Sequence, residues 1–175
     1  MRGSMLMAAA ACRHMELVEL LLAAGASVNL TDGFGSTALS ASCCSLQCQP
    51  VRRAIAGDVR SSSSNGDIVR RLLAAAAQPD VQDTLGLSPL MVASVSGEID
   101  CIKLLIQARA NAELCEKNGH TAATLADLYG QHLAVKLLKA QATQQDRPRT
   151  AGRRRACITA GHVTRLRQRL LPPAA

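Results

Sequence analysis

Aromatic side chains are almost absent from this sequence of 175 residues, which holds one Phe, one Tyr and no Trp. Proteins that stack single-stranded nucleic acid on their surface need several such rings, so this class of function is disfavoured. Long apolar runs are lacking too, and none reaches the roughly 18 residues that a membrane-spanning helix needs. Because 48% of the residues are hydrophobic and 19% are charged, the chain can still form a core, built mainly of alanine and leucine. Small and aliphatic side chains of this kind suit closely packed helices.

Complete motifs for metal binding, phosphate binding or catalysis are missing as well. Seven cysteines occur, but Cys43, Cys44 and Cys48 form no CxxC pair and have no neighbouring His, so a zinc site is not indicated. We expect the cysteines to be small buried thiols in a reducing compartment. No two of the four histidines are four residues apart, and no glycine-rich phosphate loop occurs. The sequence therefore predicts no catalytic residue, no metal and no cofactor.

The excess of positive charge lies in the C-terminal segment. Residues 1–145 hold twelve basic and twelve acidic residues, whereas residues 146–175 hold eight arginines and one aspartate, which accounts for the net charge of +7. The simplest interpretation of residues 146–175 is a disordered, solvated tail. The alternatives are a nuclear-import signal, a short basic amphipathic helix, or a patch that binds nucleic acid or anionic lipid. The arginines that would carry these functions are Arg147, Arg149, Arg153, Arg154, Arg155, Arg165, Arg167 and Arg169.

The first apolar stretch, MLMAAAAC at residues 5–12, has the length of a signal-peptide core. It runs directly into Arg13 and Glu16 and continues as an amphipathic segment, so secretion is the weaker alternative. We expect an intracellular protein in the cytoplasm, with the nucleus as an alternative.

The sequence repeats itself with a period of 33 residues. Gly86 recurs as Gly119, and Ser88 recurs as Thr121. The step back from Ser88 to Thr37 is 51 residues, so eighteen additional residues must lie between about 46 and 64. Two further columns with this spacing are Val18, Val69, Ile102, Val135 and Leu21, Leu72, Leu105, Leu138.

A 33-residue period with these residues resembles the ankyrin repeat family. The third repeat carries the motif most fully, in Asp83-x-x-Gly86-x-Ser88-Pro89-Leu90-Met91-x-Ala93. The resemblance covers about residues 4–142 and indicates four repeats within a domain at 1–145. Their approximate bounds are 1–31, 32–82 with an insertion at 46–64, 83–115 and 116–145. It implies an all-α solenoid of stacked helix-turn-helix repeats with β-hairpin loops.

Hydrophobic spacing supports the same architecture independently. Leu17, Val18, Leu21 and Leu22 follow the period of an amphipathic helix. The segment before each such helix is rich in Ala and Ser, which lets helix pairs approach closely. No single unit is long enough to bury its own apolar stripe, so the units must stack.

Ser88 invites a catalytic interpretation, since Gly86-Leu87-Ser88 begins a Gly-x-Ser-x-Gly nucleophile elbow. The elbow fails because residue 90 is Leu. A hydroxyl also recurs in every repeat, at Ser4, Thr37 and Thr121, whereas a nucleophile is needed only once. We predict that Ser88 caps a helix and that Pro89 opens it.

Three departures from the family pattern have structural consequences. The histidine that usually ties neighbouring hairpins is replaced, so we expect weaker hydrogen bonding between repeats; the residues in its place are Met7, Ser40, Met91 and Thr124. The glycine that ends the second helix is present as Gly25, but Ala76 and Arg109 replace it. A Cβ in the left-handed backbone of that position costs about 1 kcal/mol. Lys139 stands where Leu22, Leu73 and Ile106 stand in the earlier repeats, which predicts a solvent-facing C-terminal cap.

Residues 46–64 contain Pro50, Gly57 and four consecutive serines, which is typical of a loop. The simplest interpretation is a tolerated surface insertion. The alternative is a regulatory or binding loop, in which Arg60 ahead of the serines marks a phosphorylation site.

The resemblance implies a non-catalytic protein–protein interaction module, an adaptor or scaffold that acts as a monomer on a protein partner of unknown identity. Its partner contacts fall on hairpin tips and on the ends of the first helices. Carried over by position, the tips are Gly33, Phe34, Ser36, Gln82, Thr84, Leu85, Leu87, Lys117, Asn118 and His120, and the helix ends are Cys44, Ser45, Val95, Ser96, Leu128 and Tyr129. Phe34 and Tyr129, the two aromatic residues, both fall in this set, and aromatic rings often anchor protein interfaces. The alternative is that Phe34 packs on a neighbouring hairpin and Tyr129 on the cap.

Overall fold

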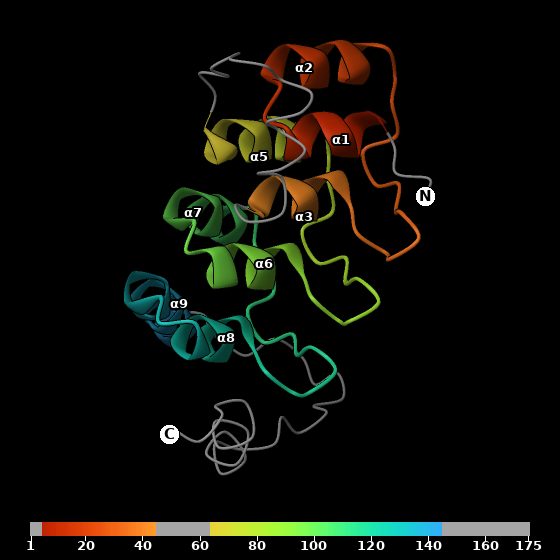
Figure 1. The fold of residues 1–175 in the computed structure, drawn as a ribbon. Coiled ribbons are helices and arrows are strands. Elements are labelled where there is room, and N and C mark those ends of the chain that lie inside the picture. The colour runs from red at the N-terminus through yellow and green to blue at the C-terminus, as the bar shows by residue number, and fades with distance from the viewer. Residues whose placement is uncertain (1–4, 45–63, 145–175) are drawn as a thin grey trace, which may run out of the picture.

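The computed structural model of the protein describes residues 5–44 and 64–144. Within these ranges, eight helices form four antiparallel pairs that stack in chain order (Figure 1). The pairs are α1 (Met5–Ala11) with α2 (Met15–Ala23), α3 (Ala38–Cys43) with α5 (Asn65–Ala74), α6 (Pro89–Ser96) with α7 (Ile99–Gln107), and α8 (Ala122–Leu128) with α9 (His132–Gln144). The first helices form one layer, the second helices form the other, and the loops between pairs project along one edge. The predicted solenoid of helix pairs is confirmed.

Hydroxyl side chains begin the first helices of the last three repeats. The side-chain oxygens of Thr37, Ser88 and Thr121 each accept a hydrogen bond from the backbone N–H three residues later. Pro89 occupies the first turn of α6, where its missing N–H has no helical partner to lose. The capping role predicted for Ser88 is confirmed, whereas its counterpart Ser4 lies outside the described residues.

The core runs through all four helix pairs. Val18, Val69 and Ile102, which occupy one repeat position on the second helices, are fully buried, and Val135 is 8% exposed. Ala9, Ala93 and Ala126 lie at one position of the first helices and are also buried. Because these alanines are small, successive pairs pack at close range, as interior packing density requires.

The loops between pairs are tight turns, and the described residues contain no β-strand. Two backbone hydrogen bonds close each turn. The first runs from Asp32 N to Ser36 O, from Asp83 N to Leu87 O and from Glu116 N to His120 O, and the second runs to the carbonyl of the same acidic residue from the N–H of Gly35, Gly86 or Gly119. These three loops, residues 32–36, 83–87 and 116–120, are called the hairpin row below.

Left-handed backbone occurs where the repeat pattern predicts it. The φ angles at the position that follows the second helix are 79° at Gly25, 62° at Ala76 and 61° at Arg109. Arg13 also has a positive φ, 60°, in the turn where the later repeats have Gly97 and Gly130. Three residues with a Cβ therefore adopt a conformation that favours glycine.

Hydrogen bonds between repeats come from loop residues instead of the missing histidine. The carboxamide of Asn29 accepts a bond from Gln78 N, and the carboxylate of Asp80 accepts one from Asn111 N, both at 2.8 Å. Ser40 and Thr124, at the histidine position, donate instead to the carbonyls of their own helix caps. The expected weakness of inter-repeat bonding stays a prediction.

The predicted insertion coincides almost entirely with a range that the structure does not describe. Residues 46–63 and the basic segment 146–175 lie outside the described residues, as does Ser45. Ser64, the last residue of the predicted insertion, is the N-cap of α5. Its side chain accepts a bond from Asp67 N at 3.2 Å, while the Asp67 carboxylate accepts one from Ser64 N at 3.1 Å. This reciprocal capping box begins α5 directly after the predicted insertion, whose bounds stay a prediction.

Candidate functional site

Two apolar side chains stand exposed at the tips of neighbouring hairpins. Phe34 is 70% exposed and Leu85 is 59% exposed. The backbone N–H of Thr84 donates to the carbonyl of Phe34 at 2.8 Å, so the two tips are joined directly. Phe34 therefore does not bury its ring against the neighbouring hairpin, which was the alternative raised from the sequence.

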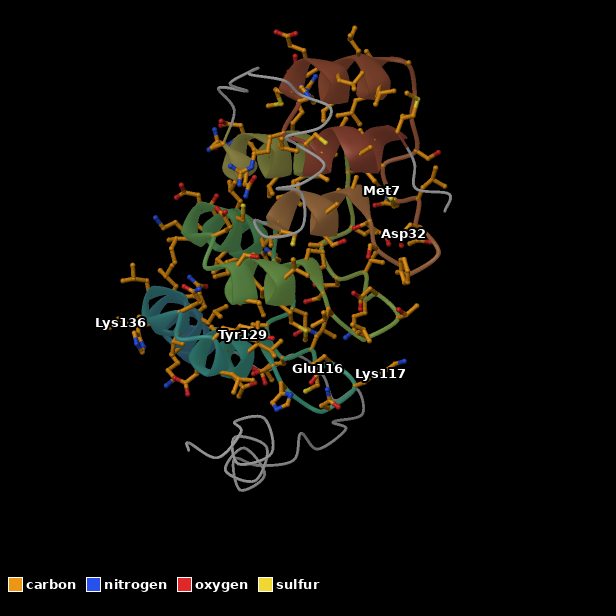
Figure 2. The ribbon with its side chains drawn as sticks, viewed as in Figure 1. Met7, Asp32, Glu116, Lys117, Tyr129 and Lys136 are labelled. Atoms are coloured by element: carbon orange, nitrogen blue, oxygen red, sulfur yellow. The ribbon has the colours of Figure 1, made fainter. Side chains whose placement is uncertain are left out.

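A half-buried aspartate holds each of these tips in shape. Asp32 Oδ1 accepts bonds from the N–H groups of Phe34 and Ser36, at 2.8 and 2.9 Å. Asp83 Oδ1 does the same for Leu85 and Leu87, both at 2.9 Å. Figure 2 shows Asp32 at the edge of the stack formed by the loops. The tips are preorganised by bonds from their backbone N–H groups to Asp32 and Asp83, and the side chains of Phe34 and Leu85 take no part in that bonding.

The last hairpin is polar and uses a glutamate where the others use aspartate. Glu116 Oε2 accepts bonds from the backbone N–H and the side-chain amide of Asn118, both at 3.0 Å. The longer side chain also lets Oε1 lie 2.6 Å from His120 Nδ1. Burial opposes ionisation of Glu116, but the hydrogen bonds from Asn118 and His120 outweigh it and lower the pKa of this carboxyl. His120 is thereby turned toward Glu116, while Lys117 and Asn118 remain exposed (Figure 2).

The loop that contains Lys117 is joined to the loop before it by a backbone hydrogen bond, as the first two loops are joined to each other. Lys117 N donates to Leu85 O at 3.1 Å. Gln82 adds a side-chain bond to Cys115 O at 3.0 Å. The three hairpins therefore form one continuous edge, apolar at Phe34 and Leu85 and cationic at Lys117.

The predicted helix-end residues form a second group, separate from the hairpin row. Leu128 and Tyr129 are 52% and 58% exposed at the C-terminal end of α8. The last hairpin precedes the opposite end of that helix, so about 10 Å of helix separates it from Tyr129. Val95 and Ser96 are half-buried at the end of α6, and Cys44 is half-buried after α3. The structure thus brings Phe34 and Leu85 together but places Tyr129 apart from them.

Some predicted contact positions mainly support the loops. Ser36 and Leu87 are half-buried, with their backbone N–H groups bonded to Asp32 and Asp83. Leu87 also packs against the hydrophobic core. Gly33 and Thr84, by contrast, are exposed.

Three of the five cysteines in the described residues are buried. Cys12, Cys43 and Cys101 are buried free thiols, and Cys44 is a half-buried one. A hydrogen bond with Cys101 and burial raise the pKa of the Cys43 thiol well above its usual value, which disfavours the reactive thiolate. Cys115 is disulfide-bonded, so the prediction of free thiols is wrong for that residue. In residues 5–44 and 64–144, no three side chains of His, Cys, Asp or Glu are placed to hold a metal ion.

Sequence reasoning overlooked large apolar residues at the first helix pair. Met5 is 72% exposed and Leu20 is 67% exposed. A comparison of each residue with its equivalents in the later repeats would have drawn attention to them. No helix in the described part of the chain is both long and apolar enough to cross a membrane.

These features define a helical repeat solenoid whose hairpin row and helix ends offer an extended contact surface. A family model of three ankyrin repeats matches residues 54–147, and a single-repeat ankyrin model matches residues 4–33. The chain belongs to the ankyrin repeat family, as its 33-residue period predicted. Ankyrin repeats are generally non-catalytic protein–protein interaction modules, and the matches indicate no family of enzymes.

Several known proteins are similar in sequence to parts of this chain. Human "Ankyrin repeat domain-containing protein 37" is 47% identical over 45 residues, which are 26% of this chain and 28% of that protein. The mouse protein of the same name is 45% identical over 49 residues, 28% of this chain and 31% of the relative. Chicken inversin is 30% identical over 90 residues, which cover 50% of this chain and 8% of inversin. The chain therefore spans less than a third of the length of these relatives.

Proposed function

We propose that this protein is a non-catalytic adaptor that binds a protein partner through its hairpin row and the exposed ends of its first helices. The observation that carries the proposal is the pair Phe34 and Leu85, exposed side by side on tips that are joined by a backbone hydrogen bond. Exposed apolar groups on a rigid support resemble the anchors of protein interfaces.

The hairpin row suits recognition because its shape does not depend on its contact side chains. Asp32 and Asp83 hold the tips through backbone N–H groups, so the tip side chains can vary without loss of the turn. A partner that binds such preformed loops loses little free energy to ordering them. Lys117, at the end of the row, adds a positive charge that favours an acidic group on the partner.

The proposed contact set has two parts. The hairpin row contributes Phe34, Ser36, Thr84, Leu85, Leu87, Lys117, Asn118 and His120, and the helix ends contribute Cys44, Ser45, Val95, Ser96, Leu128 and Tyr129. The protein acts as an intracellular monomer in this proposal, in the cytoplasm or the nucleus.

Affinity capture followed by mass spectrometry tests this function. The tagged chain of 175 residues is compared with a variant in which Phe34, Leu85 and Tyr129 are replaced by alanine. We expect partners that are enriched on the native chain to be lost from the variant. Leu133→Ala is the matched control, because Leu133 is 65% exposed but lies on α9, away from the row. Retention of every partner by the triple variant would contradict the proposal.

The basic segment offers a second candidate function, since residues 146–175 hold the entire net charge of +7. In this alternative the arginines direct nuclear import or bind nucleic acid or anionic membranes, and the repeats serve as a scaffold. Deletion of residues 146–175 separates the two functions. A hairpin-row adaptor keeps its partner after the deletion, whereas a tail-driven protein loses localisation or polyanion affinity. Binding through the arginines should also weaken steeply as salt is raised.

A further inference from the structure

Two of the four asparagines in the chain, Asn65 and Asn118, are followed directly by glycine. An asparagine loses its side-chain amide without an enzyme when the backbone nitrogen of the next residue attacks its Cγ. Glycine favours this attack because it has no Cβ to hinder the approach and restricts the backbone least. The dipeptide is the same at both sites, so the fold decides which of them reacts.

Asn118 lies where the fold leaves room for the reaction. It is exposed at the tip of the last hairpin. Gly119 has a φ of 86°, and in the described part of the chain no atom beyond its two neighbours lies within 4 Å of the place that a Cβ on it would take. The cyclic imide that the attack produces therefore meets no obstacle here. The tip of one loop also opens at a lower free-energy cost than a packed helix.

Asn65 lies where the fold opposes the same reaction. It is 4% exposed, in the first turn of α5. A Cβ on Gly66 would lie 3.4 Å from Asp100 Cβ and 3.6 Å from Leu104 Cδ1, both on α7 of the next repeat. The backbone nitrogen of Gly66 can turn toward the Asn65 side chain only if the start of α5 unwinds and separates from α7. This requires a larger opening of the structure than the release of one hairpin tip.

Glu116 holds both reacting groups of the exposed site. Its Oε2 accepts a bond from Asn118 Nδ2 at 3.0 Å, and its backbone carbonyl accepts one from Gly119 N at 2.9 Å. The side-chain amide must leave the carboxylate before its Cγ can meet the nitrogen of Gly119. Glu116 therefore sets how often the side chain of Asn118 is free to react.

From this contrast we propose that Asn118 is a site of spontaneous deamidation that Glu116 restrains, and that the fold protects Asn65. Gly119 N forms a bond to Asn118 Cγ while the Cγ–Nδ2 bond breaks, and the amide nitrogen leaves as ammonia with the proton from Gly119 N. Water then opens the succinimide at one of its two carbonyl carbons. Attack at Cγ yields aspartate, and attack at the backbone carbonyl carbon yields isoaspartate. The proposal does not depend on the proposed function.

Either product changes the charge of the hairpin row. The new carboxylate replaces an amide whose nitrogen lies 3.0 Å from Glu116 Oε2, so two negative groups would face each other. It also stands next to Lys117, the exposed lysine of this hairpin (Figure 2). Deamidation therefore offsets the positive charge at this end of the row and weakens the turn that Glu116 holds.

Peptide mapping of the 175-residue chain by mass spectrometry tests the proposal. Folded protein is kept at mildly alkaline pH beside a sample in concentrated guanidinium chloride, and the acid formed at each asparagine is measured over time. In the folded protein, Asn118 should deamidate at least about tenfold faster than Asn65. In guanidinium chloride the two sites should react at similar rates. The proposal is overturned if Asn118 reacts no faster than Asn65 in the folded protein, or if guanidinium chloride leaves their ratio unchanged.

Glu116→Gln tests the restraint. Loss of the charged acceptor should raise the rate at Asn118 several-fold and leave the rate at Asn65 unchanged. Glu113→Gln is the matched control, because it makes the same change at an exposed glutamate just before the hairpin, and both rates should stay the same. An unchanged rate at Asn118 in Glu116→Gln would overturn the role of Glu116. Equal acceleration at Asn118 and Asn65 would also overturn it, since that result would show a general loosening of the fold.

Discussion

Glu116 Oε1 lies 2.6 Å from His120 Nδ1 within the last hairpin, and no other hairpin of the row has such a pair. The glutamate at this position, in place of aspartate, provides the reach that the contact needs. Hydrogen bonds from Asn118 and His120 lower the pKa of Glu116 against the effect of burial. A lowered folded-state pKa means that Glu116 stabilises the fold at pH values above the ordinary glutamate pKa of about 4.3.

Glu116→Gln should therefore destabilise the protein by about 1 kcal/mol at neutral pH, because the charged acceptor of three hydrogen bonds is lost. The difference between the native and variant free energies of unfolding should shrink as pH falls through the lowered pKa, where the native carboxyl becomes protonated. Urea unfolding at a series of pH values measures both quantities. A difference that stayed constant down to acidic pH would show that ionisation of Glu116 does not contribute.

Arg109→Gly should raise the melting temperature by a few degrees. Arg109 has a φ of 61°, and glycine relieves about 1 kcal/mol of strain in that conformation. Ala108→Gly is the matched control, because Ala108 has a φ of −74° and glycine has nothing to relieve there. Differential scanning calorimetry should give a melting temperature above that of the native chain for Arg109→Gly and below it for Ala108→Gly. Equal effects of both glycines would contradict the strain argument.

Gly97→Ala should destabilise the protein. Gly97 has a φ of 72°, and a Cβ at this position would collide with the side-chain amide of Gln131 in the next repeat. The expected cost is about 1 kcal/mol from the backbone, with a smaller addition because the end of the flexible Gln131 side chain must move aside. Gln131→Ala in the same chain should recover part of the loss, as measured by a double-mutant cycle of unfolding free energies. If the changes in unfolding free energy of the two substitutions simply added in the double mutant, the cost of Gly97→Ala would come from the backbone alone.

Ser88→Ala should lower the free energy of unfolding by about 1 kcal/mol, since the hydroxyl caps α6 by accepting from Met91 N. Ser27→Ala is a control at an exposed serine and should change stability little. Chemical denaturation with circular dichroism measures both variants. Equal free energies of unfolding for Ser88→Ala and the native chain would contradict a stabilising role for this cap.

The period of the sequence was sufficient to predict the helix pairs, their order and their caps, because each structural requirement recurs at one repeat position. Thr37, Ser88 and Thr121 illustrate this: three hydroxyls at one spacing serve three helix starts. The left-handed residues Ala76 and Arg109 were predicted for the same reason.

Features that occur once were harder to predict. The contact between His120 and Glu116 depends on the one methylene by which glutamate is longer than the aspartate of the other hairpins. The capping box of Ser64 and Asp67 lies at the end of an insertion that has no counterpart in the other repeats. The separation of Tyr129 from Phe34 follows from which end of a helix each residue occupies, and position in a repeat does not by itself reveal distance across a surface.

The most direct test of the adaptor function is the dissociation constant of a captured partner for the native chain and for the Phe34→Ala, Leu85→Ala double variant. Both side chains are exposed, so the variant should keep the native melting temperature. We predict at least about a tenfold loss of affinity, as is typical when two interface anchors are truncated, and no loss for Leu133→Ala. Unchanged affinity of the folded double variant for every captured partner would contradict binding through the hairpin row.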